Sequence, residues 1–496
     1  MTTLSRRKFL SMLAIVSAGT AVGPLGKLYA QKPGRFPAPG VCLTNGEGVG
    51  FGPISPKLPL NAADLMSTVA GDLSQTALLE LPEGFSYTAL SITGQTMNDG
   101  ALVPGDHDGM ACFQGRRGSH ILVRNHELGP AENKFGSRVG CLPPNGKVYD
   151  PFILPAGQGG GGTTTLIIDR EGRLVRHWIS LGGTIRNCAG GLTPWDSWIS
   201  CEEDVSIPTG ANNVTKKHGY NFEVPADLPE AVDPIPLIDM GRFNHEAVAT
   251  DPQTGYVYET EDRGDSAFYK FVPKVRRARK FGDLQKGGRL YAMVIDPNVM
   301  AVCDGTIFPA TGTSADTRTG VQSFLGQPLP VSWVEIEEVD PAGDTVRVEA
   351  QSKGAALFSR GEGMWYADGL IYFVCTGGGD QGNGQVWAYD PRREAVTLLV
   401  ESTSGGALDN PDNITVGPDG ALYMCEDGGG EQFVVGVDGN GDLFKFARNN
   451  FTTSEFCGAC FSNDGRMMFV NIQGPGITYA IFRDDHRPIF VKRPPR

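Results

Sequence analysis

The sequence lacks the short motifs that mark the most common nucleotide-dependent and serine-dependent enzymes. It contains no Gly-x-Ser-x-Gly elbow, no Walker loop and no dinucleotide-binding fingerprint. Charged residues are scarce, at 20%, and the 43 Lys and Arg residues are outnumbered by 56 Asp and Glu residues. The resulting net charge of −13 leaves no broad cationic surface to neutralise phosphates, which excludes nucleic acid as a partner.

Long amphipathic helices are also missing from the sequence. In their place, 67 Gly and 34 Pro residues punctuate a chain of 496 residues. This composition indicates many short strands joined by tight turns. The sequence therefore predicts an all-β protein.

Several stretches of the chain can be aligned with one another, and the alignment places residues of metal-binding types at the same position. Each is followed by a turn rich in Pro, Asp, Asn and Gly, or by a similar short loop, and then by a second apolar run. A hairpin that recurs about every fifty residues is typical of a β-propeller, whose innermost strands line a central channel. We therefore expect a six-bladed β-propeller. Five copies begin at the following residues, and a sixth, weaker one begins at Asp108: Cys188, Glu246, Glu362, Asp412 and Cys457.

Three regions are expected along the chain. Residues 1–30 are predicted to be a signal peptide, and residues 31–100 a segment that wraps the propeller, contains a helix near residues 61–79 and supplies a closing strand. Residues 101–496 are predicted to form the catalytic propeller. Because the copies at 246 and 362 are twice the usual distance apart, residues 275–350 are expected to be an insertion or an expanded blade. Hairpins are predicted near residues 289–295 and 331–348.

The N-terminus contains an export motif. Arg6 and Arg7 lie in the sequence Ser-Arg-Arg-Lys-Phe-Leu, and the weakly apolar residues 14–22 follow. This run is too short and too rich in glycine to be a stable membrane span. We expect the twin-arginine export machinery to be a partner and the protein to be periplasmic or extracellular.

The acidic residues of the repeats are expected to converge on the channel and to bind metal ions. Buried carboxylates cannot crowd together at neutral pH unless cations offset their charge. Oxygen ligands favour calcium or magnesium, whereas a Cys188 thiolate favours iron or zinc, so a mixed cluster fits best. His126 and His245 are expected to be packed residues. The predicted ligands are Cys188, Glu127, Glu203, Glu246, Glu261, Glu362, Asp412 and Glu426.

Two arginines are predicted to face the same cavity. Arg186 and Arg360 each lie two residues before a predicted ligand, and residues i and i+2 of a strand share a face. A guanidinium among acids can hold an oxyanion or can pair with a neighbouring Glu. Metal ions with a guanidinium around one oxyanion suit phosphoryl transfer.

The ten cysteines do not predict a disulfide framework, although the protein is expected to be exported. Cys457 and Cys460 have the spacing of half a zinc site, but residues i and i+3 of a strand point to opposite faces. We therefore expect these two cysteines to be structural.

The set of motifs resembles the PhoX family of alkaline phosphatases. The resemblance is carried from about residue 100 to the C-terminus by the following stretches: Arg124-Asn-His-Glu127, Arg186-Asn-Cys-Ala-Gly-Gly191 with Ser200-Cys-Glu-Glu203, Gly241-Arg-Phe-Asn-His-Glu246, Arg360-Gly-Glu-Gly-Met-Trp365, Asp409-Asn-Pro-Asp-Asn413 and Phe461-Ser-Asn-Asp-Gly465.

The resemblance implies a monomeric propeller that carries two ferric ions and several calcium ions and hydrolyses phosphate monoesters. It implies that Cys188, Glu246 and Glu362 bind iron, and that Arg360 and Asn125 contact phosphate. The following residues would be further cluster or calcium ligands: Glu127, Glu203, Asp412 and Glu426.

Two other classes of function fit a propeller with acidic inner strands. One is a calcium-dependent hydrolase of the lactonase type, and the other is a non-catalytic propeller that binds a partner across its face. Cys188 and the two arginines argue against the first, because a lactonase needs neither a thiolate ligand nor an oxyanion fork.

Overall fold

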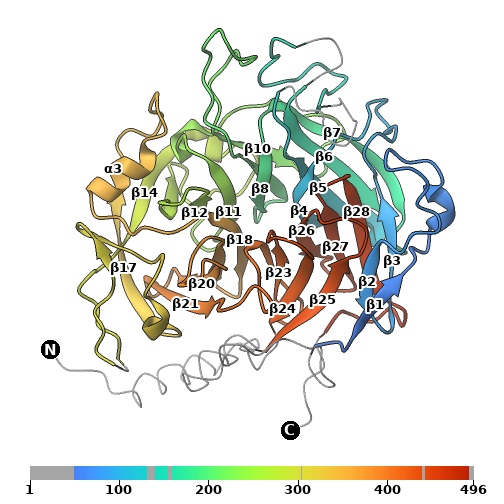
Figure 1. Cartoon of the computed structure of the whole chain (residues 1–496). Coiled ribbons are helices and arrows are strands. Elements are labelled where there is room, and N and C mark those ends of the chain that lie inside the picture. The colour runs from blue at the N-terminus through green and yellow to red at the C-terminus, as the bar shows by residue number, and fades with distance from the viewer. Residues whose placement is uncertain (1–49, 131–139, 155–158, 303, 438–441, 491–496) are drawn as a thin grey trace.

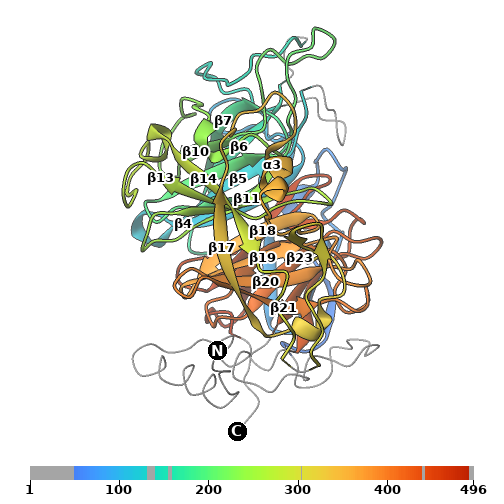
Figure 2. The same ribbon diagram turned by 90° about the vertical axis from the view of Figure 1, so that its left-hand side faces the viewer.

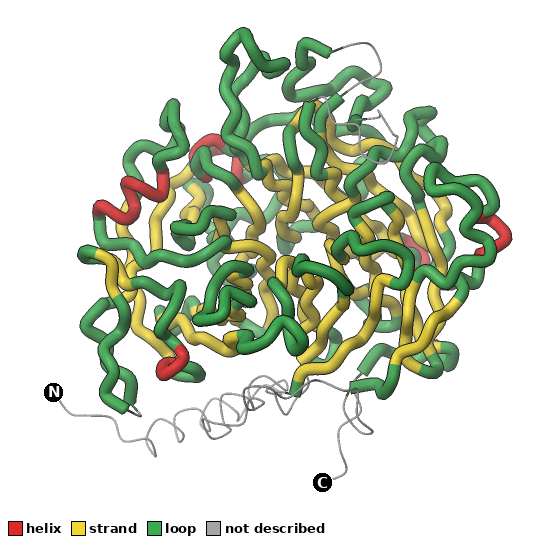
Figure 3. Tube along the Cα trace, in the orientation of Figure 1, coloured by secondary structure: helices red, strands yellow, loops and turns green. Residues whose placement is uncertain are grey.

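The computed structural model describes residues 50–130, 140–154, 159–302, 304–437 and 442–490, so the predicted signal peptide lies outside the described residues. The described chain is almost entirely strand and loop, and its few helical segments are short and peripheral (Figure 3). Antiparallel sheets surround a common centre in a propeller-like arrangement (Figure 1). The all-β prediction is therefore confirmed. No helix in the described ranges is long and apolar enough to cross a membrane.

Most strands follow the chain as consecutive antiparallel neighbours. The first sheets comprise β4 (His107–Gln114), β5 (His120–His126), β6 (Gly161–Ile168) and β7 (Leu174–Thr184), then β8 (Asn187–Leu192), β9 (Ser197–Glu202) and β10 (Asn221–Pro225). Next come β11 (His245–Thr250), β12 (Val257–Glu261), β13 (Tyr269–Pro273) and β14 (Gly288–Ile295).

The second half of the chain repeats this pattern. It contains β18 (Gly361–Ala367), β19 (Leu370–Cys375), β20 (Gln385–Asp390) and β21 (Ala395–Glu401), then β22 (Pro411–Val416), β23 (Leu422–Glu426), β24 (Phe433–Val437) and β25 (Leu443–Asn449). The last strands are β26 (Phe456–Phe461), β27 (Met467–Ile472) and β28 (Ile477–Arg483). Apolar clusters fill the spaces between neighbouring sheets, as between Leu122 on β5 and Phe469 on β27.

The N-terminal segment contributes strands to two sheets. β3 (Phe85–Leu90) pairs with β28, so the start of the described chain closes the last sheet, as expected. β1 (Ile54–Lys57) and β2 (Leu79–Pro82) extend the sheet of β25. The helix predicted over residues 61–79 is wrong, since only a 3-10 turn forms at Ala62–Leu65. A turn between Thr68 and Gly71, with φ of +94° at the glycine, bends the chain where a helix would have to continue.

The segment between β14 and β18 expands a sheet, one of the two expected alternatives, because residues 291–295 pair with residues 331–335. β17 (Pro328–Glu335) pairs with β14 on one side and with β21 on the other, which creates a nine-stranded sheet (Figure 2). Residues 289–295 lie within β14, and residues 331–348 contain the end of β17 and the start of α3 (Val346–Ser352). Between them lie the two-residue strands β15 (Ala310–Thr311) and β16 (Ser314–Ala315).

Candidate active site

Six inner strands each have a β-bulge at the position where the sequence repeats align. Strands β4, β8, β11, β18, β22 and β26 contact one another in succession, and β26 contacts β4. In each of them the pairing register with the second strand shifts by one residue. A β-bulge of this kind re-aims side chains. The shifts begin just before Asp108, Cys188, Glu246, Glu362 and Asp412, and just after Cys457.

Four of these inner strands are each preceded by a residue with unusual backbone geometry. This residue lies two positions before the side chain at the bulge. Asp106, Arg186, Arg360 and Asn410 have φ of 43°, 46°, 51° and 50°. Residues other than glycine rarely adopt this left-handed region, and such strain clusters at functional sites. Each of their carbonyls accepts a hydrogen bond from the residue that follows the second strand, such as the Glu203 amide on Arg186.

The side chains that follow the second strands point toward the centre, whereas those one position earlier do not. Glu203 lies near Cys188 and Glu246, and Glu127 lies beside Arg186. By contrast, the preceding residue Glu202 accepts hydrogen bonds from His218 and from the amides of Gly219 and Tyr220. One step along a strand exchanges the two faces of a sheet.

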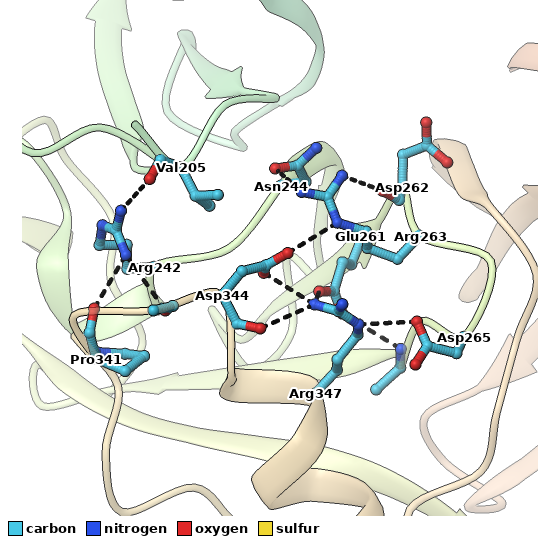
Figure 4. A network of polar contacts seen from close by, with 12 residues as sticks. Val205, Arg242, Asn244, Glu261, Asp262, Arg263, Asp265, Pro341, Asp344 and Arg347 are labelled. Atoms are coloured by element: carbon cyan, nitrogen blue, oxygen red, sulfur yellow. Dashed lines mark hydrogen bonds and ion pairs between the residues drawn. The ribbon is translucent and has the colours of Figure 1, made fainter. Parts of the chain in front are cut away.

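The same alternation corrects two of the predicted ligands. Glu261 accepts a hydrogen bond of 2.7 Å from the Tyr269 hydroxyl and lies 3.5 Å from Arg347 (Figure 4). Glu426 accepts a hydrogen bond of 2.8 Å from the Asp409 amide. Both side chains are buried outside the two groups of converging ligands, so the structure does not bring these two predicted ligands to the centre.

Two groups of potential metal ligands converge at the centre and share one residue. Cys188, Glu203 and Glu246 form the first group, and Glu246, Glu362 and Asp412 form the second. Within each group the ligand atoms all lie within 4.8 Å of one another. The Cys188 thiol donates to Glu246 Oε2 at 2.9 Å. The shared Glu246 places the two groups side by side.

The electrostatics of this centre favour bound cations. Burial raises the pKa values of Glu246 and Glu362 well above the usual range, and neighbouring carboxylates add to the shift. Burial, together with Asp427, raises the pKa of Asp412 to about 7. The buried Oδ1 atoms of Asp108 and Asp412 have no hydrogen-bond partner among the described residues. Unpartnered buried carboxylate oxygens are costly without a cation, so the residues fit a metal centre.

Both predicted arginines reach this centre, and both form ion pairs there. Arg186 Nη2 contacts Glu127 and Glu203, the latter at 2.5 Å. Arg360 donates from Nε to Asp262 at 2.9 Å and from Nη2 to Glu362 at 2.6 Å. Their side chains are 37% and 41% exposed, so each remains open to a ligand.

The family of the chain follows from comparison with known proteins. The family model described as alkaline phosphatase PhoX matches residues 67–476. The chain belongs to this family. It is therefore a PhoX phosphatase, a metal-dependent enzyme that hydrolyses phosphoric monoesters. No curated protein sequence matches the chain.

One solved structure supports the same fold. The PhoX of Pseudomonas fluorescens, in complex with vanadate as a transition-state analogue, is 17% identical with a TM-score of 0.63. The match covers 83% of this chain and 97% of that one. A gluconolactonase from Xanthomonas campestris is 11% identical with a TM-score of only 0.34, over 89% of this chain and 99% of that one. The family match therefore favours the phosphatase over the lactonase and the non-catalytic propeller.

Asn125 has a structural position in this PhoX protein. Its amide donates to the carbonyls of Cys188, at 3.2 Å, and Ala189, at 2.6 Å. Its oxygen accepts from the Trp198 indole and the Ser200 hydroxyl, both at 2.9 Å. The side chain is fully buried and its hydrogen-bonding capacity is used within the protein, which leaves none for the predicted phosphate contact in this structure.

The structure also brings together acids that were not predicted as ligands. Burial raises the pKa values of Asp108 and Glu455 well above the usual range. Electrostatic repulsion from neighbouring carboxylates, including Asp412 and Glu246, adds to both shifts. Asp262 and Asp427 occupy the position after a second strand that Glu203 and Glu127 also occupy. That shared position is the signal that the sequence alignment overlooked.

Cys457, Cys460, His126 and His245 are packed against protein groups, as expected. The eight described cysteines are buried and form no disulfide. Cys457 donates to the His107 carbonyl at 2.7 Å, while Cys460 lies in an apolar cluster, so the two do not share a ligand position. His126 contacts Thr164 at 2.9 Å, and His245 contacts the Gly241 carbonyl at 3.0 Å.

Replacing Asn125 by Ala should therefore mainly lower the free energy of unfolding. The change leaves the buried Trp198 and Ser200 donors and two carbonyls without their partner, at a cost of about 1–3 kcal/mol or more. Urea unfolding should show a lower midpoint than in the parent protein. Asn298→Ala, at an exposed loop position, is the control and should change the midpoint little. An unchanged midpoint for Asn125→Ala would contradict the structural role.

Proposed function

We propose that this chain is an exported, monomeric phosphomonoesterase that works at a mixed iron and calcium cluster in the channel of a six-bladed propeller. The observation that carries the proposal is the pair of ligand groups that share Glu246, one of which contains the Cys188 thiol. The closed succession of contacts among β4, β8, β11, β18, β22 and β26 supports the six-bladed arrangement.

The choice of metals rests on the chemistry of the two groups. A thiolate is a poor ligand for hard calcium and a good one for iron, so Cys188, Glu203 and Glu246 would hold a ferric ion. Glu246, Glu362 and Asp412 offer only oxygens, so this set and the nearby Asp108 suit further iron or calcium ions. Bound ions would offset the carboxylate charge and polarise the oxygens of a phosphate ester.

The chain's own contribution to catalysis is to orient the phosphoryl group. Asp262 and Glu362 fix the guanidinium of Arg360, while its Nη1 makes no hydrogen bond to the described residues. A guanidinium held in this way can donate to phosphoryl oxygens without reorganising, which is how fixed donors stabilise developing charge. Arg186 is anchored by Glu127 and Glu203 in the same manner. We assign both arginines to substrate binding.

Export by the twin-arginine route completes the proposal. Arg6 and Arg7 precede a weakly apolar run, and a metal cluster built into a folded channel suits a pathway that carries folded proteins.

The thiol in the ligand set predicts a coloured protein. If Cys188 binds ferric iron, charge transfer from sulfur to iron should give a visible absorption band. Cys188→Ser should remove the band, lower the iron content and abolish most activity, as absorbance, metal analysis and phosphatase assays would show. Cys112→Ser, at a buried thiol on β4 outside the site, should keep colour and iron. A colourless parent protein, or unchanged iron in Cys188→Ser, would refute iron binding by Cys188.

Arg360→Lys should slow turnover without removing metal. The lysine keeps the charge but loses the planar fork, and loss of one such donor lowers kcat/KM by roughly ten- to a thousandfold. Steady-state kinetics with a simple aryl phosphate and metal analysis would measure both effects. The same substitution at Arg318, which pairs with Asp316 away from the site, is the matched control. Parent-like kinetics would mean that Arg360 only pairs with Asp262 and Glu362.

Export should depend on both N-terminal arginines. Replacing Arg6 and Arg7 by Lys should leave folded protein in the cytoplasm, because the receptor reads the arginine pair. Cell fractionation with an activity assay would locate the enzyme. Undiminished activity outside the inner membrane would contradict the twin-arginine assignment.

A further inference from the structure

A cavity of about 350 Å³ adjoins the candidate metal centre. It is lined by Arg186 and Glu203, which belong to that centre, by the segment 204–206, and by Asn244 and Arg263. Arg263 follows β12 and its half-buried side chain is 30% exposed. Neither the sequence repeats nor the proposed catalytic residues account for this second cation on the cavity wall.

Arg263 is held firmly and still has unused donors. Its Nε donates to Asp344 Oδ2 at 2.9 Å, its Nη2 to Asn244 Oδ1 at 2.7 Å, and its Nη1 to the Asp262 carbonyl at 3.1 Å (Figure 4). An arginine has five N–H donors, so these three bonds leave one hydrogen on each terminal nitrogen. A guanidinium with a free hydrogen on both nitrogens can still bind a planar anion.

The partner that fixes Arg263 is shared with a second arginine. Asp344 Oδ1 also forms an ion pair with Arg347 Nη1 at 2.9 Å, and Arg347 contacts Glu261 and Asp265 beyond it. One carboxylate thus binds two guanidinium groups, and it takes only the Nε hydrogen of Arg263. Arg347 lies in the same network (Figure 4), and it is not one of the residues that line the cavity.

The walls of the cavity are tied together by a buried arginine. Arg242 donates to the carbonyls of Val205 and of Pro341, the latter at 3.0 Å (Figure 4). These bonds connect the segment 204–206 on one side with the segment that carries Asp344 on the other. Arg263 is therefore fixed relative to the metal centre.

The two carboxylates on the cavity wall are both engaged. Glu203 pairs with Arg186, and Asp204 accepts a hydrogen bond of 2.6 Å from the Ser206 amide. An anion that entered the cavity would meet Arg263 beside carboxylates that already have partners. The cavity is thus suited to a negatively charged group next to the reacting phosphoryl group.

We propose that Arg263 binds a second anionic group on the alcohol part of the substrate. The enzyme would then prefer phosphate esters whose leaving group carries a carboxylate or a further phosphate over esters of neutral alcohols. This inference rests on the phosphatase activity and names the class of ester that the site favours. Arg186 and Arg360 bind the phosphoryl group, and Arg263 selects the leaving group.

The test compares matched esters in the metal-loaded enzyme. 3-Phosphoglycerate and glycerol 3-phosphate differ by a carboxylate, and fructose 1,6-bisphosphate and fructose 6-phosphate differ by a phosphate. Arg263→Gln should lower the kcat/KM ratio of the charged to the neutral ester by about tenfold or more, mainly through KM, because the anion loses its partner. The pair whose ratio falls shows whether carboxylates, phosphates or both are bound.

Arg347→Gln is the matched control, since Arg347 shares Asp344 but does not line the cavity. Its ratios should stay within about twofold of the parent values even if overall activity falls, because it touches no substrate. Unchanged ratios in Arg263→Gln, or an equal fall in both variants, would overturn the proposal. Hydrolysis of neither ester by the parent enzyme would instead contradict the phosphatase function.

Product inhibition of the unmodified enzyme gives a second test that needs no variant. Glycerate, the carboxylate-bearing product, should inhibit glycerol 3-phosphate hydrolysis at least about tenfold more strongly than glycerol does, because only glycerate carries the anion. Equal inhibition by the two alcohols would overturn the proposal even if Arg263→Gln failed to fold.

Discussion

The crowding of carboxylates on one axis is the constraint on which the rest of this structure depends. Glu246, Glu362 and Asp412 come from three different strands, yet their oxygens lie within 4.8 Å of one another. Like charges so close together, and largely removed from water, repel strongly, and the raised pKa values record that cost. The chain must therefore hold the acids in place by other interactions until cations or protons offset their charge.

The surrounding sheets supply that rigidity. Apolar clusters between neighbouring sheets bury large side chains such as Trp387 and Tyr389, and burial of this kind is the main favourable contribution to folding. The left-handed residues Arg186, Arg360 and Asn410 cost about 1–3 kcal/mol each, which only a well-packed scaffold can offset. Pairing of β3 with β28 and of β17 with both β14 and β21 links segments that are distant in sequence and so opposes loosening of the centre.

The sequence repeats predicted the central residues better than the residues around them. The inner strands repeat one local pattern, so aligning them found Cys188, Glu246, Glu362 and Asp412, and the end of one second strand added Glu203. At two other second strands the alignment was one residue out, where it chose Glu261 and Glu426 instead of Asp262 and Asp427. A bulge in the first strand changes the register without leaving a mark in composition, and one residue exchanges the two faces of the second strand.

Asn125 and Arg263 show a different limit. Asn125 lies within a stretch that resembles the family, yet its role depends on Trp198 and on carbonyls of β8, which no local pattern specifies. Arg263 lies outside the positions that the repeats share, so the alignment of the repeats does not mark it. Its partner Asp344 lies 81 residues further along the chain. Such long-range partners become visible only when the folded chain brings them together.

The fold separates the chemistry of the phosphoryl group from the recognition of the alcohol. The proposed metal ligands and Arg360 come from the inner strands, their ends or the residue that follows a second strand, and the inner strands contact neighbours on both sides. The Arg263 side of the cavity depends instead on residues 341–344, which precede α3 in the segment between β17 and β18. Because these residues contribute no metal ligand, changes there can reshape the cavity wall without moving the central acids. Preference for the leaving group can thus vary in this fold while the phosphoryl site stays the same.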